Sequence, residues 1–110
     1  MKLEDCPVRS ALKIIGGKWK PVIIYRLMEG KVRYGELKRL LPDVSQKMLT
    51  QQLRELERDG VLQRKVLSEN PPHVEYQLSP HGRALRPTMR ALCDWGGSGK
   101  TRLAAAKLKL

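Results

Sequence analysis

The sequence contains no phenylalanine, and two tryptophans and three tyrosines are its only other large aromatic residues. Modules that bind RNA by base stacking usually present several aromatic side chains, so this scarcity disfavours such a module. Cysteine is also scarce, because Cys6 and Cys93 are the only two. Two cysteines cannot form a disulfide framework or a four-cysteine zinc site, and they fit a reducing cytoplasm.

Long apolar runs are missing as well. No run approaches the length of about 18 residues that marks a membrane-spanning helix, and no apolar signal segment follows Met1. The sequence therefore predicts a cytoplasmic protein that neither spans a membrane nor is secreted. The two histidines and two cysteines lack the spacing of metal ligands, and no nucleophile is paired with a base. We expect no metal, no cofactor and no enzymatic activity.

Acidic residues are few in comparison with basic ones. Eleven Asp and Glu oppose 22 Lys and Arg, which gives a net charge of +11 and a pI near 10.1. The segment from Gln77 to the end contains seven basic residues and one acidic residue, Asp94, so that 7 − 1 = +6 of the net charge lies there. A basic excess on a small domain indicates a polyanionic partner, most often nucleic acid. A solubility device or a ribosome-type basic protein is the alternative.

With 110 residues the chain has the length of one domain. Apolar spacing, with proline or a capping residue at helix starts and glycine or proline after their ends, predicts four successive helices. Their ranges are 6–15, 20–29, 34–41 and 45–59. Two strands, 62–67 and 74–78, follow as a hairpin whose Pro71-Pro72 tip is stiff and cannot itself be strand. A final helix over 80–95 carries the apolar stripe Leu85, Met89, Leu92 and Cys93.

Three helices followed by a β-hairpin are the element order of a winged helix-turn-helix. The predicted fold class is α+β, mainly α, a winged helix-turn-helix with extra N- and C-terminal helices that such domains use to dimerise. We assign residues 1–97 to this DNA-binding and dimerisation domain. Residues 98–110 are predicted to be a basic, flexible tail, with residues 103–110 as a marginal helix at most.

The helix over 45–59 has two unlike faces. Ser45 is its N-cap and Gly60 its terminator, and Leu49, Leu53 and Leu56 share one side. Donors and cations occupy the other side: Lys47, Thr50, Gln51, Arg54 and Arg58. Glu55 and Glu57 lie off to the sides of this polar face. As the second helix of a helix-turn-helix it would enter the major groove, whereas a plain solvated face is the alternative.

Base and phosphate contacts can be assigned within this scheme. Gln51 can pair with adenine and Arg54 with guanine, while Ser45, Lys47 and Thr50 suit phosphates or groove edges. Arg33, with Lys31, can hold backbone phosphate ahead of this helix. The hairpin tip has only His73 as a potential cation, with Arg64 and Lys65 on its first strand. At the start of the helix over 20–29, Trp19 is assigned to the core. Lys18 and Lys20 either flank DNA or are solvated.

Several motifs together resemble the HxlR-type bacterial transcriptional regulators, winged-helix proteins related to the MarR type. The matching stretches are Cys6-Pro7-Val8, Ile15 to Lys20, Arg33 to Leu37, Leu41-Pro42, Ser45 to Glu57, Asp59-Gly60, Pro71 to Tyr76 and Trp95-Gly96. Leu67, Asn70 and His73 depart from the residues common in the family. The resemblance covers residues 6–96 and implies a homodimeric, sequence-specific DNA-binding regulator. In several members a cysteine near the N-terminus senses oxidants or electrophiles, which implies this role for Cys6.

The residues around Cys6 leave its role open. A helix start is where the macrodipole favours thiolate, and Arg9 adds to this effect, but Glu4 and Asp5 oppose it. The chemistry alone thus allows an inert structural cysteine as readily as a redox switch. Cys93 is predicted to be buried and inert.

The leading interpretation is a regulator that binds a pseudo-palindromic operator as a homodimer. Its interface is predicted to combine helix 6–15 with helix 80–95, because both carry apolar stripes with little left to cover them. Two other classes stay open: a non-specific basic protein of RNA or the nucleoid, and a winged helix that binds an acidic protein partner.

Overall fold

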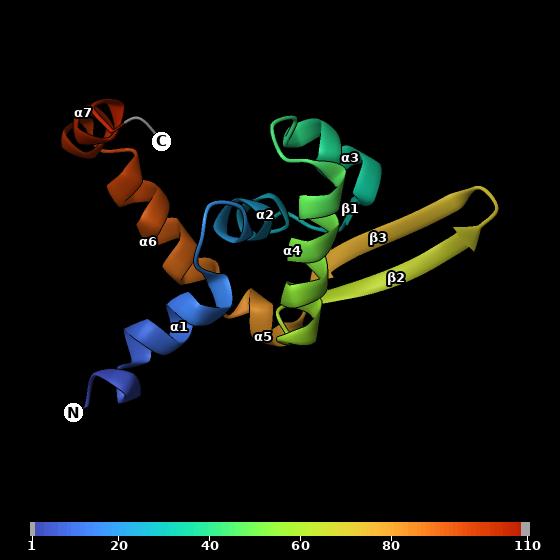
Figure 1. Cartoon of the computed structure of the whole chain (residues 1–110), viewed down its shortest axis with the longest axis horizontal. Coiled ribbons are helices and arrows are strands. Elements are labelled where there is room, and N and C mark those ends of the chain that lie inside the picture. Colours follow the sequence, from blue (N-terminus) through green and yellow to red (C-terminus); the bar gives the residue numbers. More distant parts are fainter. Residues whose placement is uncertain (1, 109–110) are drawn as a thin grey trace.

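The structure is a computed structural model that describes residues 2–108. Figure 1 shows its elements in chain order. They are a 3-10 turn η1 (Leu3–Asp5), α1 (Pro7–Ile15), α2 (Lys20–Arg26), β1 (Val32–Arg33), α3 (Tyr34–Leu40), α4 (Gln46–Arg58), β2 (Leu62–Glu69), β3 (Pro72–Leu78), α5 (Pro80–Arg83), α6 (Arg86–Gly96) and α7 (Gly99–Ala106). The fold class predicted from the sequence, a mainly helical winged helix-turn-helix, is confirmed.

The four helices expected before the hairpin are present. The bounds of α1, α3 and α4 agree with the predicted ranges to within one residue. Helix α2 ends three residues earlier than expected, at Arg26, and a turn leads from there to Gly30, whose φ of +149° suits glycine. Apolar spacing predicted α2, α3 and α4 correctly because each buries one face against the same core.

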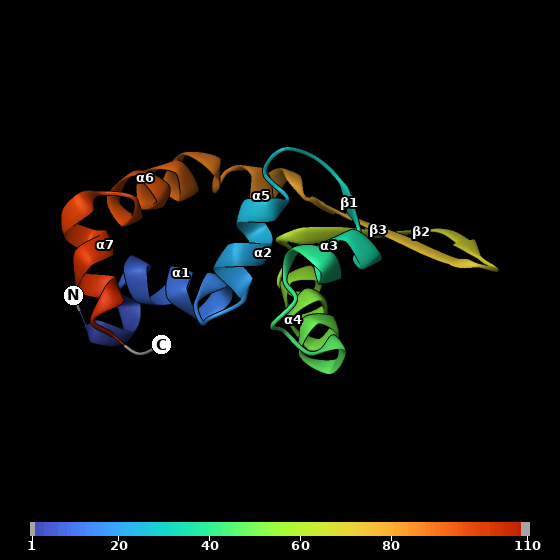
Figure 2. The ribbon, with the colours of Figure 1, turned by 90° about the horizontal axis from the view of Figure 1, so that it is seen from above.

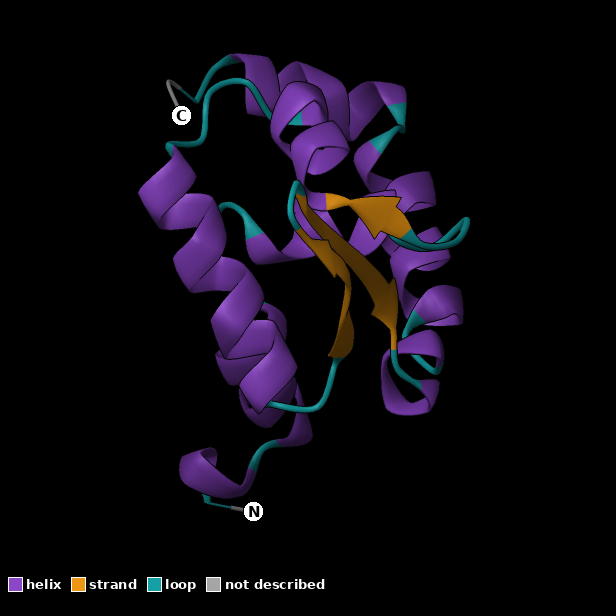
Figure 3. Cartoon of the chain, turned by 90° about the vertical axis from the view of Figure 1, so that its right-hand side faces the viewer, coloured by secondary structure: helices purple, strands orange, loops and turns teal. Residues whose placement is uncertain are grey.

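That core lies between α2, α3, α4 and the sheet. Its fully buried side chains include Ile23, Ile24, Leu27, Leu37, Leu49, Leu53 and Leu56. From the N-terminal helix only Ile15 is buried, and from α6 only Met89. Figure 3, seen from the side of the hairpin tip, shows the strands with helices on both sides.

The sheet has three antiparallel strands in the order β1-β3-β2. The short β1, which the sequence did not reveal, pairs Val32 with Tyr76 and so ties the start of α3 to the hairpin. The hairpin is longer than predicted, and Pro72 is part of β3, paired with Glu69. The prediction that the Pro-Pro tip contains no strand was therefore wrong for Pro72. Proline is tolerated as the first residue of a strand, where its missing N–H matters least.

The single helix expected over 80–95 is two helices instead. Helix α5 ends at Arg83, and α6 starts at Arg86, directly before Pro87. Pro87 has no N–H to bond to the carbonyl of Arg83, and its ring would clash with that carbonyl in a continuous helix. Pro87 therefore sits in the first turn of the new helix, where proline is favoured.

The tail also differs from its prediction. Residues expected to be loose form α7, and the helix starts at Gly99, four residues before the marginal helix considered at Leu103. Ser98 is its N-cap, with the Ser98 Oγ accepting from the backbone N–H of Thr101 at 3.2 Å. The cap is a local signal that the glycines around it obscured. Lys109 and Leu110 lie outside the described residues.

The terminal helices extend away from the core. Figures 1 and 2 show α1, α6 and α7 on the side of the molecule opposite the hairpin. The radius of gyration is 15.3 Å, whereas a compact domain of this length has about 13 Å. None of the helices within residues 2–108 is both long enough and apolar enough to cross a membrane.

Candidate nucleic-acid interface

Helix α4 is held in the fold by its apolar side. Leu49, Leu53 and Leu56 are completely buried, one turn after another, against α2 and the sheet. Because these three positions face inward, the opposite side of α4 faces solvent. The packing therefore decides which polar side chains of the helix are presented.

The N-terminal half of α4 is fixed by three polar contacts. The Ser45 Oγ accepts from the backbone N–H of Met48 at 3.0 Å, which confirms Ser45 as the N-cap. From α3, the Tyr34 hydroxyl donates to the Gln46 carbonyl at 3.3 Å and lies 3.1 Å from the Thr50 Oγ1. Tyr34 thus joins the two helices of the helix-turn-helix directly.

The outer face of α4 lines an open cleft of about 700 Å³. Its lining residues are Lys47, Gln51, Arg54, Glu55 and Arg58. Lys47, Gln51 and Arg54 are exposed, so the structure places these three candidates together as the sequence predicted. Glu55 lies at the edge of this group, off to the side of the polar face as the sequence predicted, where it pairs with Lys20 of α2. It follows Gln51 by four residues, one helical turn, and so lies next to Gln51 on the helix surface.

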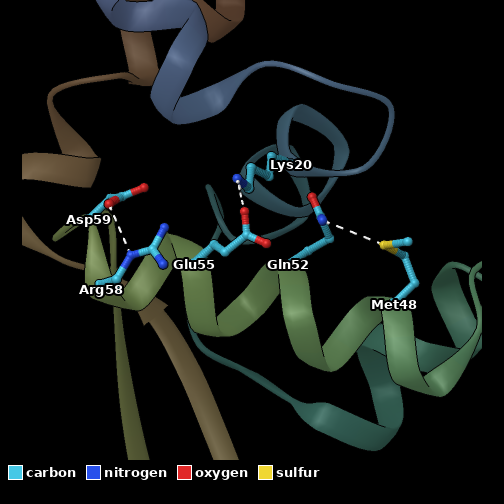
Figure 4. Close-up of polar contacts among 6 residues, drawn as sticks. All are labelled: Lys20, Met48, Gln52, Glu55, Arg58 and Asp59. Atoms are coloured by element: carbon cyan, nitrogen blue, oxygen red, sulfur yellow. Dashed lines mark hydrogen bonds and ion pairs between the residues drawn. The ribbon is translucent and has the colours of Figure 1, made fainter.

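A partly buried ion pair holds Glu55. The Lys20 Nζ of α2 donates to the Glu55 Oε1 at 2.8 Å, and Lys20 is only 8 % exposed (Figure 4). The hydrogen bond from Lys20 lowers the pKa of Glu55; partial burial opposes this effect, and a hydrogen bond from Gln51 adds to it. The sequence interpretation of Lys20 as solvated or flanking DNA was wrong, because its partner lies 35 residues away along the chain.

The remaining polar candidates surround a second cleft, between α3 and the hairpin. It is lined by Arg33, which is exposed, by Thr50, which is half-buried, and by His73. The His73 ring does not project from the hairpin tip, because its side chain is only 23 % exposed and its Nε2 lies 3.9 Å from the Glu75 Oε2. Lys31 and Lys65 are exposed nearby. The candidates therefore form two groups, one on the outer face of α4 and one around this second cleft.

The two cysteines lie in the terminal helices, away from both groups. Cys6 is half-buried and is the N-cap residue of α1, as expected from Pro7. Cys93 on α6 is exposed. The prediction that Cys93 is buried was wrong, since α6 leaves the core after Met89 and nothing in residues 2–108 covers Leu92 and Cys93. Trp19 packs against the core as expected, with the Lys18 Nζ 5.0 Å from its ring centroid.

Sequence reasoning missed Tyr34 and Glu55 as parts of the interface. The one-turn spacing between Gln51 and Glu55 was a usable signal, whereas the contact between the Tyr34 hydroxyl and Thr50 depends on how two helices cross. Within the described part of the chain, no group of three or more His, Cys, Asp or Glu side chains could hold a metal ion.

The helices α2, α3 and α4 pack on one core, the third of them presents a donor-rich face, and a two-stranded wing adjoins them. This arrangement defines a winged helix-turn-helix protein. The chain belongs to the HxlR-like helix-turn-helix family of transcriptional regulators, whose model matches residues 14–103. The resemblance that the sequence motifs suggested is thereby confirmed.

Similar proteins support this assignment. The helix-turn-helix transcriptional regulator YdeP of Bacillus subtilis is 51 % identical over 100 residues, which cover 91 % of this chain and 78 % of YdeP. The redox regulator HypR in its reduced form has a TM-score of 0.84 and 44 % identity, covering 91 % of this chain and 99 % of HypR. The reduced transcriptional regulator YodB of B. subtilis has a TM-score of 0.72 and 38 % identity, and the match covers 83 % of this chain and 90 % of YodB.

Proposed function

We propose that this protein is a sequence-specific DNA-binding regulator that acts as a homodimer on a pseudo-palindromic operator. The observation that carries the proposal is the outer face of α4, where Lys47, Gln51 and Arg54 are exposed on a rigidly held helix. A helix presented in this way enters the major groove, where its donors meet base edges.

Each candidate has a defined role in this proposal. Gln51 reads adenine and Arg54 reads guanine, each through a pair of hydrogen bonds. Glu55 lines the same cleft one helical turn after Gln51 and is itself held by Lys20, so it is placed to orient the Gln51 amide. The remaining contacts, to phosphates or groove edges, are assigned to Ser45, Lys47, Thr50, Arg33 and His73.

The experiment that tests this function is selection of bound sequences from a random DNA pool. We expect a palindromic site to be enriched. Arg54→Ala and Gln51→Ala should each relax the preference at one base position by about 1–3 kcal/mol, whereas Arg33→Ala should weaken all sequences alike. Enrichment of no sequence would favour non-specific binding of nucleic acid. Equal loss on operator and random DNA would reassign Arg54 to a phosphate contact.

Exposed apolar side chains support the homodimer. Val8 and Leu12 of α1 are 66 % and 58 % exposed, and Leu92 and Trp95 of α6 are 49 % and 70 % exposed. Patches of large apolar side chains on a small protein mark association surfaces. An interface formed by α1 and α6 and their two-fold copies would place the two α4 helices about 34 Å apart, which is one turn of DNA, or at a multiple of that distance.

The comparisons support a redox role for Cys6. HypR is named a redox regulator, and it is known in oxidised as well as reduced form. Cys6 is the N-cap of α1, which is part of the proposed interface. Oxidation of Cys6 would therefore change how the subunits meet and how far apart the two α4 helices lie. Repeating the selection with diamide-treated protein tests this link, because operator binding should change in the native protein and not in Cys6→Ser.

A further inference from the structure

The basic excess near the end of the chain has no part in the function proposed above. It lies on α6, α7 and the residues directly after them, 86–108, which we call the basic arm. The arm contains five basic residues and one acidic residue, Asp94. Lys100 and Arg102 of α7, and Lys107 directly after it, are all exposed. Figure 2 shows the arm at the end of the molecule opposite the hairpin, so it is a second basic surface, distinct from the outer face of α4.

The charges of the arm are not neutralised by the protein itself. Within residues 2–108 none of its basic side chains lies within 4.0 Å of a carboxylate oxygen, the distance that defines an ion pair. An ordinary solvated helix mixes both signs, with an acidic residue one turn from a basic one. Helix α7 has no acidic residue at all. Basic side chains gathered in this way create a positive potential that attracts a polyanion.

Helix α7 adds nothing to the core. It has no buried residue, and Leu103 near its middle is 64 % exposed. Its start is fixed by the Ser98 cap rather than by packing. The interface proposed for the dimer uses α1 and α6, so the surface of α7 stays accessible to a partner in the dimer as well.

The residues of the arm distinguish among the polyanions. At about 100° per residue, Leu103 lies about 60° from Lys100 and about 40° from Lys107 around the helix axis. A helix that binds a membrane surface needs an apolar face opposite its basic face, and α7 has none. Single-stranded RNA is held by stacking on several aromatic rings, whereas Trp95 is the only aromatic residue of the arm. Lysine and arginine without aromatic neighbours suit the phosphates of a duplex.

We propose that the basic arm is a second DNA-binding surface, which contacts the phosphate backbone irrespective of sequence and outside the base pairs that α4 reads. Lys100, Arg102 and Lys107 make these contacts. The location outside the base pairs read by α4 rests on the proposed function. Binding of duplex DNA by the arm does not rest on it, because DNA of random sequence suffices to measure it.

The test compares the salt dependence of DNA binding in the native protein and in Lys100→Gln/Arg102→Gln/Lys107→Gln. Fluorescence anisotropy gives the affinity for a duplex of random sequence at several salt concentrations. We expect the slope of log affinity against log salt to fall by about one unit for each neutralised side chain, about three units per chain. Selection from a random pool should give the same preferred bases for both proteins. The variant should fold, since no residue of α7 is buried.

Two further variants control for charge and folding. Lys2→Gln/Arg9→Gln/Lys13→Gln removes the same charge from exposed positions beside Glu4 and Asp5, and it should change the slope by less than about one unit. Lys100→Arg/Arg102→Lys/Lys107→Arg keeps the charge of the arm. It should bind as the native protein does, because contacts to phosphate depend on charge and carry no sequence information.

Four results would overturn the proposal. The first is an unchanged slope in the arm variant, and the second is an equal loss in the control, which would make net charge the sole cause. The third is an altered base preference, which would make the contact sequence-specific. The fourth is that neutralising the arm weakens binding of single-stranded RNA and not of duplex DNA. Failure of the proposed function shows separately, as a random pool from which no operator is enriched.

Discussion

The contact between Tyr34 and α4 allows a quantitative prediction. The Tyr34 hydroxyl donates to the Gln46 carbonyl at 3.3 Å and lies 3.1 Å from the Thr50 Oγ1. Tyr34→Phe keeps the ring packing and removes both hydrogen bonds. A neutral hydrogen bond contributes about 0.5–1.5 kcal/mol net, and the longer contact belongs at the low end of that range, so we expect a loss of about 1–2 kcal/mol. For a domain of this size that loss corresponds to about 5–10 °C in Tm.

Urea unfolding followed by circular dichroism measures this loss. All variants are compared at one protein concentration, because association makes the apparent stability depend on concentration. Tyr25→Phe is the matched control, since Tyr25 lies on α2 with its ring 46 % exposed. Its loss of a hydroxyl should change the unfolding free energy by less than about 0.5 kcal/mol.

Equal stabilities of Tyr34→Phe and Tyr25→Phe would refute this reasoning. The two hydrogen bonds would then contribute no more than the water that replaces them. The proposed function gives the same variant a second readout. Because Tyr34 holds the half of α4 that enters the groove, operator affinity should fall while the preferred sequence stays the same.

Three further predictions concern other parts of the molecule. The hydrogen bond from Lys20 lowers the pKa of Glu55. The ionised Glu55 therefore stabilises the fold at a pH above the ordinary glutamate pKa of about 4.3, and this stabilisation is lost as the pH falls below that value. Urea midpoints should fall more steeply with acid in the native protein than in Glu55→Gln. Trp95→Lys should convert a dimer into a monomer at micromolar concentration in analytical ultracentrifugation, and a native protein that is already monomeric would contradict the proposed interface. In the monomeric Trp95→Lys variant, iodoacetamide should label the exposed Cys93 faster than the half-buried Cys6, and peptide mapping that shows the reverse order would contradict the burial of the two thiols in the single chain.

Much of the fold could be predicted because its signals are local. The bounds of α4 follow from the Ser45 cap, from the buried leucines and from Gly60, whose φ is +78°. The exposed positions of Lys47, Gln51 and Arg54 then follow from helical geometry alone. The order of the elements restricts a short chain to few topologies, which is why the winged helix-turn-helix could be recognised.

Other features depend on contacts between segments far apart in the sequence. The partner of Lys20 lies 35 residues away, and no periodicity connects the two side chains. The half-buried position of His73 results from the packing of the hairpin beside α3. In the same way, the exposure of Cys93 follows from the direction in which α6 leaves the core.

The sequence by itself determined the basic charge, the helices of the core and the donor-rich face of α4, since each of these depends on residue type and spacing along one segment. The tertiary structure decided that Lys20 pairs with Glu55. It also decided that three arginines without an ion-pair partner in residues 2–108 surround the cleft between α3 and the hairpin. The outer parts of the stripes of α1 and α6 also remain exposed, while Ile15 and Met89 join the core. Such properties depend on how segments meet in space, because burial and charge pairing are set by neighbours that the chain order does not specify.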